Sequence, residues 1–116
     1  MIEHKNTRFM ILCYILLAIT SVVNKSYING FAAMSAAYAS RCCEKQSKFF
    51  YTMAAAAWIP SMRVLGTIGY LLEALGKPEL ANPVLAMHFG LIAIDDSELS
   101  AVGRLSSAGL ALSYAM

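Results

Sequence analysis

The chain has 116 residues, of which 59% are apolar and 14% are charged, and its formal net charge is +2. This length allows one domain, whereas an ordinary soluble domain carries about 25% charged residues. The nine basic residues form no long stripe, so we expect no nucleic-acid partner. Composition therefore predicts a single all-α domain over residues 1–116, integral to a membrane, with four to five short helices packed through small-residue faces.

Three cysteines, Cys13, Cys42 and Cys43, constrain the chemistry of the chain. Their number is odd, and their spacing matches no metal-binding motif. A disulfide framework and a structural zinc site are therefore not expected, and reducing or lipid surroundings suit these thiols better.

The N-terminal region is strongly apolar from residue 9 to residue 23, behind the basic residues Lys5 and Arg8. Such a stretch is either a cleavable secretory signal or a retained membrane helix. Because polar residues 24–26 follow it directly, with no small-x-small cleavage site, we favour a retained helix over 9–24. At 1.5 Å per residue it is about 24 Å long, slightly short of a hydrocarbon core of roughly 30 Å.

Polar and glycine residues at 24–30 predict a turn, and a second helix is expected over 27–40. Ala32, Ala36 and Ser40 recur every four residues, a spacing that lets a neighbouring helix approach closely. The helix propensity of alanine explains the same residues equally well.

An arginine follows a proline inside the next apolar segment, 49–73. As one helix the segment is long enough to cross a bilayer, with a kink at Pro60. Arg63 would then need a carboxylate, carbonyls freed by the proline or an anionic lipid headgroup, because an unpaired charge at bilayer depth costs at least ~2.5–3.5 kcal/mol. On the alternative interpretation the helix ends near residue 59 and Pro60 begins a new one. In the kinked helix one protein-facing stripe would contain Ala56, Pro60, Arg63, Thr67 and Tyr70.

Gly76 and Pro78 predict a helix stop followed by a restart, and thus a tight helical hairpin. The helix after it runs over 78–94, or begins at Pro83 behind Asn82 as N-cap.

The last helix is expected over 96–115, with Asp95 as N-cap and Glu98 in capping-box position. Gly103, Ser107, Ala111 and Ala115 form a four-step ladder of small residues, which is the clearest predicted packing face.

His88 is the main candidate for cofactor chemistry, because it lies alone in an apolar helix. Such a histidine ligates a haem iron or a chlorophyll magnesium, or simply makes a structural hydrogen bond. No second axial ligand can be placed opposite it, and no catalytic or metal-ligating constellation is evident. The GTIGY segment at 66–70 follows no strand and indicates close packing instead of a phosphate loop.

We therefore expect a non-catalytic helical membrane subunit of a larger, energy-transducing complex, an accessory protein with an assembly role. Its expected partners are other membrane-protein subunits and lipid, including anionic headgroups. The alternatives are a stand-alone membrane transporter or enzyme that uses Arg63 and His88, a haem- or pigment-binding subunit, or a soluble oligomeric helical bundle.

Overall fold

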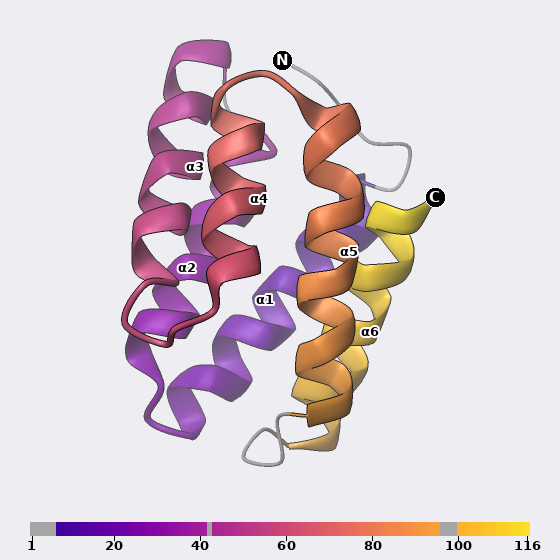
Figure 1. Ribbon diagram of the computed structural model, residues 1–116. Coiled ribbons are helices and arrows are strands. Elements are labelled where there is room, and N and C mark those ends of the chain that lie inside the picture. The colour runs from indigo at the N-terminus through magenta and orange to yellow at the C-terminus, as the bar shows by residue number, and fades with distance from the viewer. Residues whose placement is uncertain (1–6, 42, 96–99) are drawn as a thin grey trace.

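The structure, a computed structural model, describes residues 7–41, 43–95 and 100–116 (Figure 1). All regular structure in these residues is helical, so the all-α prediction is confirmed. The described helices are α1 (Thr7–Val23), α2 (Tyr27–Ala39), α3 (Glu44–Ala57), α4 (Val64–Ala74), α5 (Pro78–Asp95) and α6 (Ala101–Ala115).

The helices form a closed up-and-down ring. Each packs against the helix before it and the helix after it, and α6 closes the ring against α1. Short connections make successive helices antiparallel. Figure 1 accordingly shows the α1–α2 and α3–α4 turns toward one end of the bundle and the α4–α5 turn at the other. We call the end that holds the α1–α2 and α3–α4 turns and the start of α6 the lower end, and the opposite one the upper end.

The expected helix count of four to five is wrong, because segment 49–73 forms two helices. Pro60 has no backbone N–H to donate and lies in the turn between them. Met62 reverses the chain there with a left-handed φ of 58°. The alternative interpretation placed the break correctly, but the new helix begins at Val64 and not at Pro60. The predicted stripe from Ala56 to Tyr70 therefore does not lie on one helical face.

The remaining helix boundaries follow local signals. Gly76 adopts φ +76°, and the N–H of Lys77 donates to the carbonyl of Leu72 at 3.0 Å, which ends α4 as predicted. Helix α5 begins at Pro78 and continues through Pro83.

Helix α6 begins later than predicted, at Ala101. Its N-cap is Ser100, whose Oγ accepts from the N–H of Gly103 at 3.5 Å, and Asp95 instead ends α5. The predicted capping-box partner Glu98 lies outside the described residues. Serine takes this role because its side-chain oxygen satisfies a first-turn N–H.

Small residues face the inside of the ring. Helix α2 lies between α1 and α3, and its residues Ala32 and Ala36 and its C-cap Ser40 are all buried. In α6, Gly103 and Ser107 are buried and Ala111 is half-buried, but Ala115, the last residue of the predicted ladder, is exposed. Short side chains on these faces let the helix backbones come close together.

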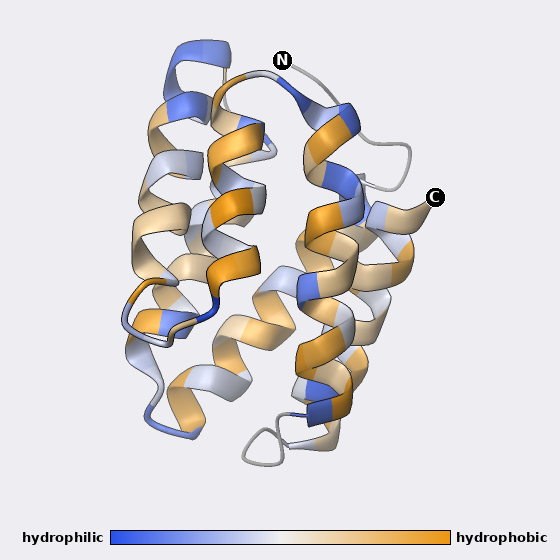
Figure 2. Ribbon diagram, viewed as in Figure 1, coloured by the Kyte–Doolittle hydropathy of each residue, from blue (hydrophilic) through white to orange (hydrophobic). Residues whose placement is uncertain are grey.

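On α4 and α6 most of the large aliphatic side chains point outward. In α4 the exposed residues Val64, Ile68 and Leu71 recur at helical spacing, whereas the buried positions include Tyr70 and Glu73. Figure 2 shows this outer orange stripe on α4. Helix α6 is similar: Val102, Leu105 and Leu112 are exposed, and the buried face consists of Gly103, Ser106, Ser107, Gly109, Leu110, Ser113 and Tyr114. A helix of a water-soluble bundle usually buries its apolar stripe, so α4 and α6 depart from that pattern, whereas other helices bury large apolar residues such as Leu17, Leu85 and Phe89.

Charged residues lie at the two ends of the bundle. Every described lysine, arginine, aspartate and glutamate is in a connection or within the first or last five residues of a helix. Among the described residues, the middle of the outer surface therefore contains no charged side chain. Among the described helices, none combines the length and the hydropathy that a membrane crossing requires.

Candidate functional site

A cavity of about 200 Å³ lies at the lower end, between the start of α4 and the middle of α5. The α3–α4 turn brings Arg63 to its rim, and α5 supplies His88. Its lining consists of Met62, Arg63, Val64, Leu65, His88 and Leu91. The two polar side chains that the sequence singled out, 25 positions apart in the chain, thus border one space.

The side chain of His88 is buried and packed against two aromatic rings and a glycine. The side chain is 2% exposed, and its ring centroid lies 4.6 Å from that of Trp58 and 4.6 Å from that of Phe89. A β-carbon on Gly66 would lie 2.7 Å from Cε1 of His88. A glycine in α4 therefore makes room for the imidazole.

The Nε2 atom of His88 is buried and has no hydrogen-bond partner among the described residues. An unsatisfied buried polar atom costs about 1–3 kcal/mol, and native structures contain few of them. Such an atom beside a cavity is a place where a ligand or a water molecule would gain a hydrogen bond.

Electrostatics keep the imidazole neutral. Burial, and secondarily the positive charge of Arg63, lowers the pKa of His88 from 6.5 to about 3. A neutral imidazole has one N–H donor and one acceptor nitrogen, so at neutral pH it is able to give a hydrogen bond to a ligand. The positive charge at this site is then supplied by Arg63.

A second, smaller cavity of about 140 Å³ adjoins the same arginine. Its lining is mainly apolar and consists of Ile59, Met62, Arg63, Val64 and Thr67. The two cavities share Met62, Arg63 and Val64, so the guanidinium lies between a space that contains a histidine and a space lined mostly by aliphatic side chains.

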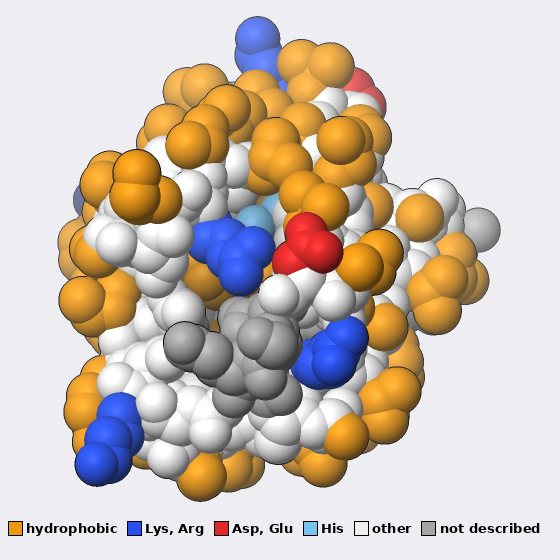
Figure 3. Space-filling model, turned by 60° about the horizontal axis from the view of Figure 1, so that its bottom comes forward, with side chains coloured by type: hydrophobic (Ala, Val, Ile, Leu, Met, Phe, Trp, Pro, Cys, Tyr) orange, Lys and Arg blue, Asp and Glu red, His pale blue; other side chains and the backbone are white. Residues whose placement is uncertain are grey.

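The surface around this site combines charged and apolar side chains. Figure 3 shows basic and acidic side chains next to a histidine on the lower end, with apolar side chains above them in the view. Arg104 caps the C-terminal end of α5: its Nε donates to the carbonyl of Ala93 at 2.8 Å and its Nη2 to that of Ile94 at 3.1 Å. Arginine at a helix C-terminus satisfies carbonyls that have no partner within the helix.

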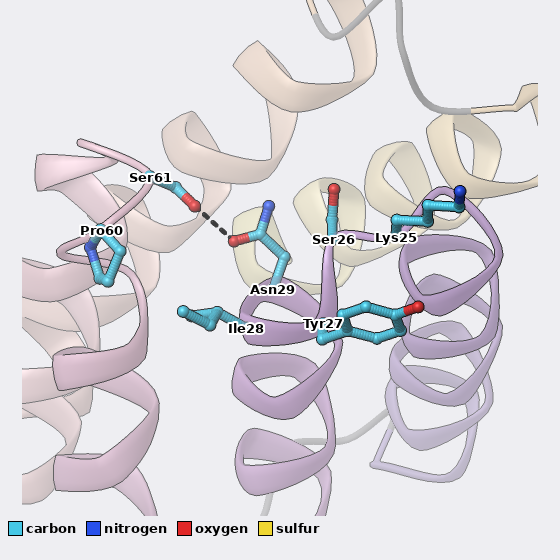
Figure 4. A pocket seen from close by; sticks show the side chains of 7 residues that line it. All are labelled: Lys25, Ser26, Tyr27, Ile28, Asn29, Pro60 and Ser61. Atoms are coloured by element: carbon cyan, nitrogen blue, oxygen red, sulfur yellow. Dashed lines mark hydrogen bonds between the residues drawn. The ribbon is translucent and has the colours of Figure 1, made fainter.

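A shallow groove of about 290 Å³ separates the α1–α2 turn from the α3–α4 turn, and Pro60 forms one of its walls (Figure 4). Ser61 Oγ donates to Asn29 Oδ1 at 2.5 Å across it. Because these polar groups bind each other, the groove offers a ligand less than the Arg63–His88 cavity does.

Tyrosine hydroxyls meet at the centre of the ring. Tyr14 Oη of α1 lies 2.7 Å from Tyr70 Oη of α4 and is also hydrogen-bonded to Tyr114 Oη of α6. Tyr51 stacks on Tyr70 with ring centroids 6.1 Å apart. Side chains from four of the six described helices thus meet in one cluster, and the core also contains other buried polar residues, among them Glu73 and Ser107.

These phenols are unsuited to act as bases. Burial raises the pKa of Tyr14, Tyr70 and Tyr114 well above 10, and the nearby Glu73 carboxyl adds to the rise at Tyr70 and Tyr114. They remain protonated at neutral pH and act as hydrogen-bonding groups that fix the helices relative to one another. We interpret the cluster as structural.

Sequence reasoning did not find the tyrosine cluster. The available signal was that each tyrosine lies on the small-residue side of its helix: Tyr70 is four residues after Gly66, and Tyr114 seven after Ser107. Among the described residues, no group of three or more histidine, cysteine, aspartate or glutamate side chains is able to hold a metal ion.

Comparisons with models of protein families, with curated proteins and with solved structures find no match to this chain. The function is therefore argued from its own side chains and their arrangement.

Proposed function

We propose that the chain is a non-catalytic helical subunit, held by its apolar outer surface within a larger membrane-protein complex. The observation that supports this role is the exposure of aliphatic stripes, above all on α4 and α6, whose buried faces consist largely of glycine, serine and tyrosine. Energy transduction is the setting in which we expect such a complex.

Outward apolar residues are common on soluble proteins, but they are usually scattered singly. Here they form stripes along each described helix except α3. Leu105 is 72% exposed, Leu112 65% and Ile94 72%. Contiguous apolar surface of this kind marks a contact with protein or lipid. Partner subunits and lipid acyl chains are both able to cover such a surface.

The charges support the same placement. Because they lie at the two ends of the bundle, the apolar middle can be covered without desolvating an ion. Burying an unpaired ion would cost several kcal/mol, whereas burying leucine or isoleucine is favourable by about 1.5–3 kcal/mol for each side chain.

The test is a double substitution on the outer face of α6, Leu105→Gln with Leu112→Gln. In the proposed subunit, the change removes apolar contacts to partners. We expect the amount of the chain in the membrane fraction to fall. The amount of the chain in the detergent-extracted particle, whose components are identified and quantified by mass spectrometry, should fall by the same factor. The fold should persist in circular dichroism, because both side chains point away from the core.

A matched control is Lys45→Gln with Lys48→Gln, two exposed residues at the upper end, which should leave assembly unchanged. If the unaltered chain dissolves without detergent as a monodisperse particle of 12.6 kDa, the proposal is wrong. If the α6 variant only improves solubility, the chain is instead a soluble oligomeric bundle.

A second candidate function rests on the Arg63–His88 cavity. A stand-alone membrane transporter or enzyme would use these polar side chains between helices as its site. Loss of an activity on Arg63→Gln with assembly intact would favour that role. Haem or chlorophyll ligation by His88 also stays a prediction, for which the absorbance spectrum of the purified material is the measurement.

A further inference from the structure

The cavity beside His88 has the chemistry of an anion site. Arg63 places a permanent positive charge at its rim, and His88 presents a buried nitrogen that lacks a hydrogen-bond partner among the described residues. Guanidinium groups bind carboxylate and phosphate oxygens with charge-assisted hydrogen bonds. A neutral imidazole adds a hydrogen bond at a fixed position, because its ring is clamped by Trp58 and by the backbone at Gly66.

The size of the cavity limits what it can hold. About 200 Å³ is less than the ~300–1,000 Å³ of pockets for drug-sized ligands. An oxyanion group fits such a space better than a large planar macrocycle does. The adjoining cavity of about 140 Å³, lined mostly by aliphatic side chains, suits a short apolar portion of the same ligand.

We propose that Arg63 and His88 form a binding site for a carboxylate or phosphate group, with the guanidinium pairing with the anion and Nε2 of His88 donating to one of its oxygens. The oxyanion belongs either to a small free anion or to the headgroup of an amphiphile whose chain enters the adjoining cavity. This inference goes beyond the proposed subunit role and does not depend on it.

Trp58 makes the site directly observable. It is the only tryptophan of the chain, and its ring lies against that of His88. A ligand that engages His88 therefore changes the surroundings of the single indole. Fluorescence reports the site without a label, and isothermal calorimetry measures the affinity independently.

The experiment titrates the full chain with inorganic phosphate, with octanoate and with the uncharged amphiphile octyl glucoside. Saturable binding of phosphate identifies a free oxyanion as ligand. If octanoate binds and phosphate does not, the ligand is an anionic amphiphile. Either result supports the site, provided that octyl glucoside gives no saturable change. An equal response to octyl glucoside, or no response to either anion, overturns it.

Two variants test the named side chains. Arg63→Gln removes the charge and should raise the dissociation constant about tenfold or more, the usual effect of losing a charged hydrogen bond. His88→Phe keeps a ring of similar size without Nε2 and should also weaken binding. Lys25→Gln is the matched control, since Lys25 is a cation of the same bundle end that lines a different groove.

Circular dichroism shows whether each variant is folded. If Arg63→Gln does not fold, the result for His88→Phe decides. Unchanged affinity in a folded variant of either residue contradicts the proposed role of that residue, and unchanged affinity in both overturns the site.

Discussion

Gly66 of α4 lies directly against His88 of α5: a β-carbon on the glycine would approach Cε1 of the imidazole to 2.7 Å. The same register repeats one turn later, where a β-carbon on Gly69 would lie 2.5 Å from Cδ2 of Leu85. Two glycines in α4 thus receive two side chains of α5. The spacing of three residues on both helices is what makes the pairs coincide.

Gly66→Ala should destabilise the protein, although alanine is the better helix former. Overpacking costs typically ~1–3 kcal/mol, and the gain in helix propensity offsets about 1 kcal/mol of it. We expect a net loss of about 1 kcal/mol in the free energy of unfolding and a shift of Trp58 fluorescence. Gly90→Ala is the control: nothing lies within 4 Å of the added carbon, so this variant should be slightly more stable. Equal stability changes in the two variants would refute the close contact.

The central hydroxyl of the tyrosine cluster should matter most. Tyr14→Phe removes the group that bonds to both Tyr70 and Tyr114, and it leaves their hydroxyls buried with fewer partners. An unmade buried hydrogen bond costs about 1–3 kcal/mol, so the midpoint of chemical unfolding should fall accordingly. Tyr38→Phe, at a residue that is 61% exposed, is expected to be neutral. A neutral Tyr14→Phe would show that the hydroxyls contribute little.

His88 should make the protein acid-sensitive. Its pKa is about 3 when folded and 6.5 in an ordinary setting, and Arg63 is the charged group that acts on it. Above pH 6.5 neither state binds the proton. As the pH falls from 6.5 toward 3 the unfolded chain binds it and the folded chain does not, so stability falls by up to about 1.4 kcal/mol per pH unit.

Unfolding measured at several pH values checks this dependence. His88→Gln removes the imidazole whose pKa differs between the two states, so the stability of this variant should vary less between pH 6.5 and pH 4. Gly90→Ala changes α5 without changing a titratable group and should keep the slope of the unaltered protein. Identical slopes for His88→Gln and the unaltered protein would exclude His88 as the source.

Arg104 should hold the end of α5. Arg104→Lys keeps the charge but cannot reproduce the two bonds to the carbonyls of Ala93 and Ile94. Because Arg104 is exposed, we expect a loss of only about 0.5–1 kcal/mol, confined to this region. Hydrogen exchange of the last amides of α5 should quicken, while exchange in α2 should not change. Faster exchange throughout the bundle would indicate a global effect instead.

The sequence by itself determined the helical class, the stop at Gly76 and the restart at Pro78, because these depend on backbone preferences within one turn. It also indicated correctly that the GTIGY glycines serve close packing. The break between α3 and α4 was harder to predict, since a proline permits both a kinked helix and a new one. The choice depends on how the flanking segments pack.

Only the tertiary structure decided which side chains meet. Closure of the ring brings Tyr14 and Tyr114 together although they are 100 positions apart, and the packing of α5 against α4 sets Arg63 beside His88. It also decides that the aliphatic stripes of α4 and α6 point outward and the serines and glycines inward. Helical periodicity defines two faces on each helix, but the neighbours in the ring determine which of them is buried.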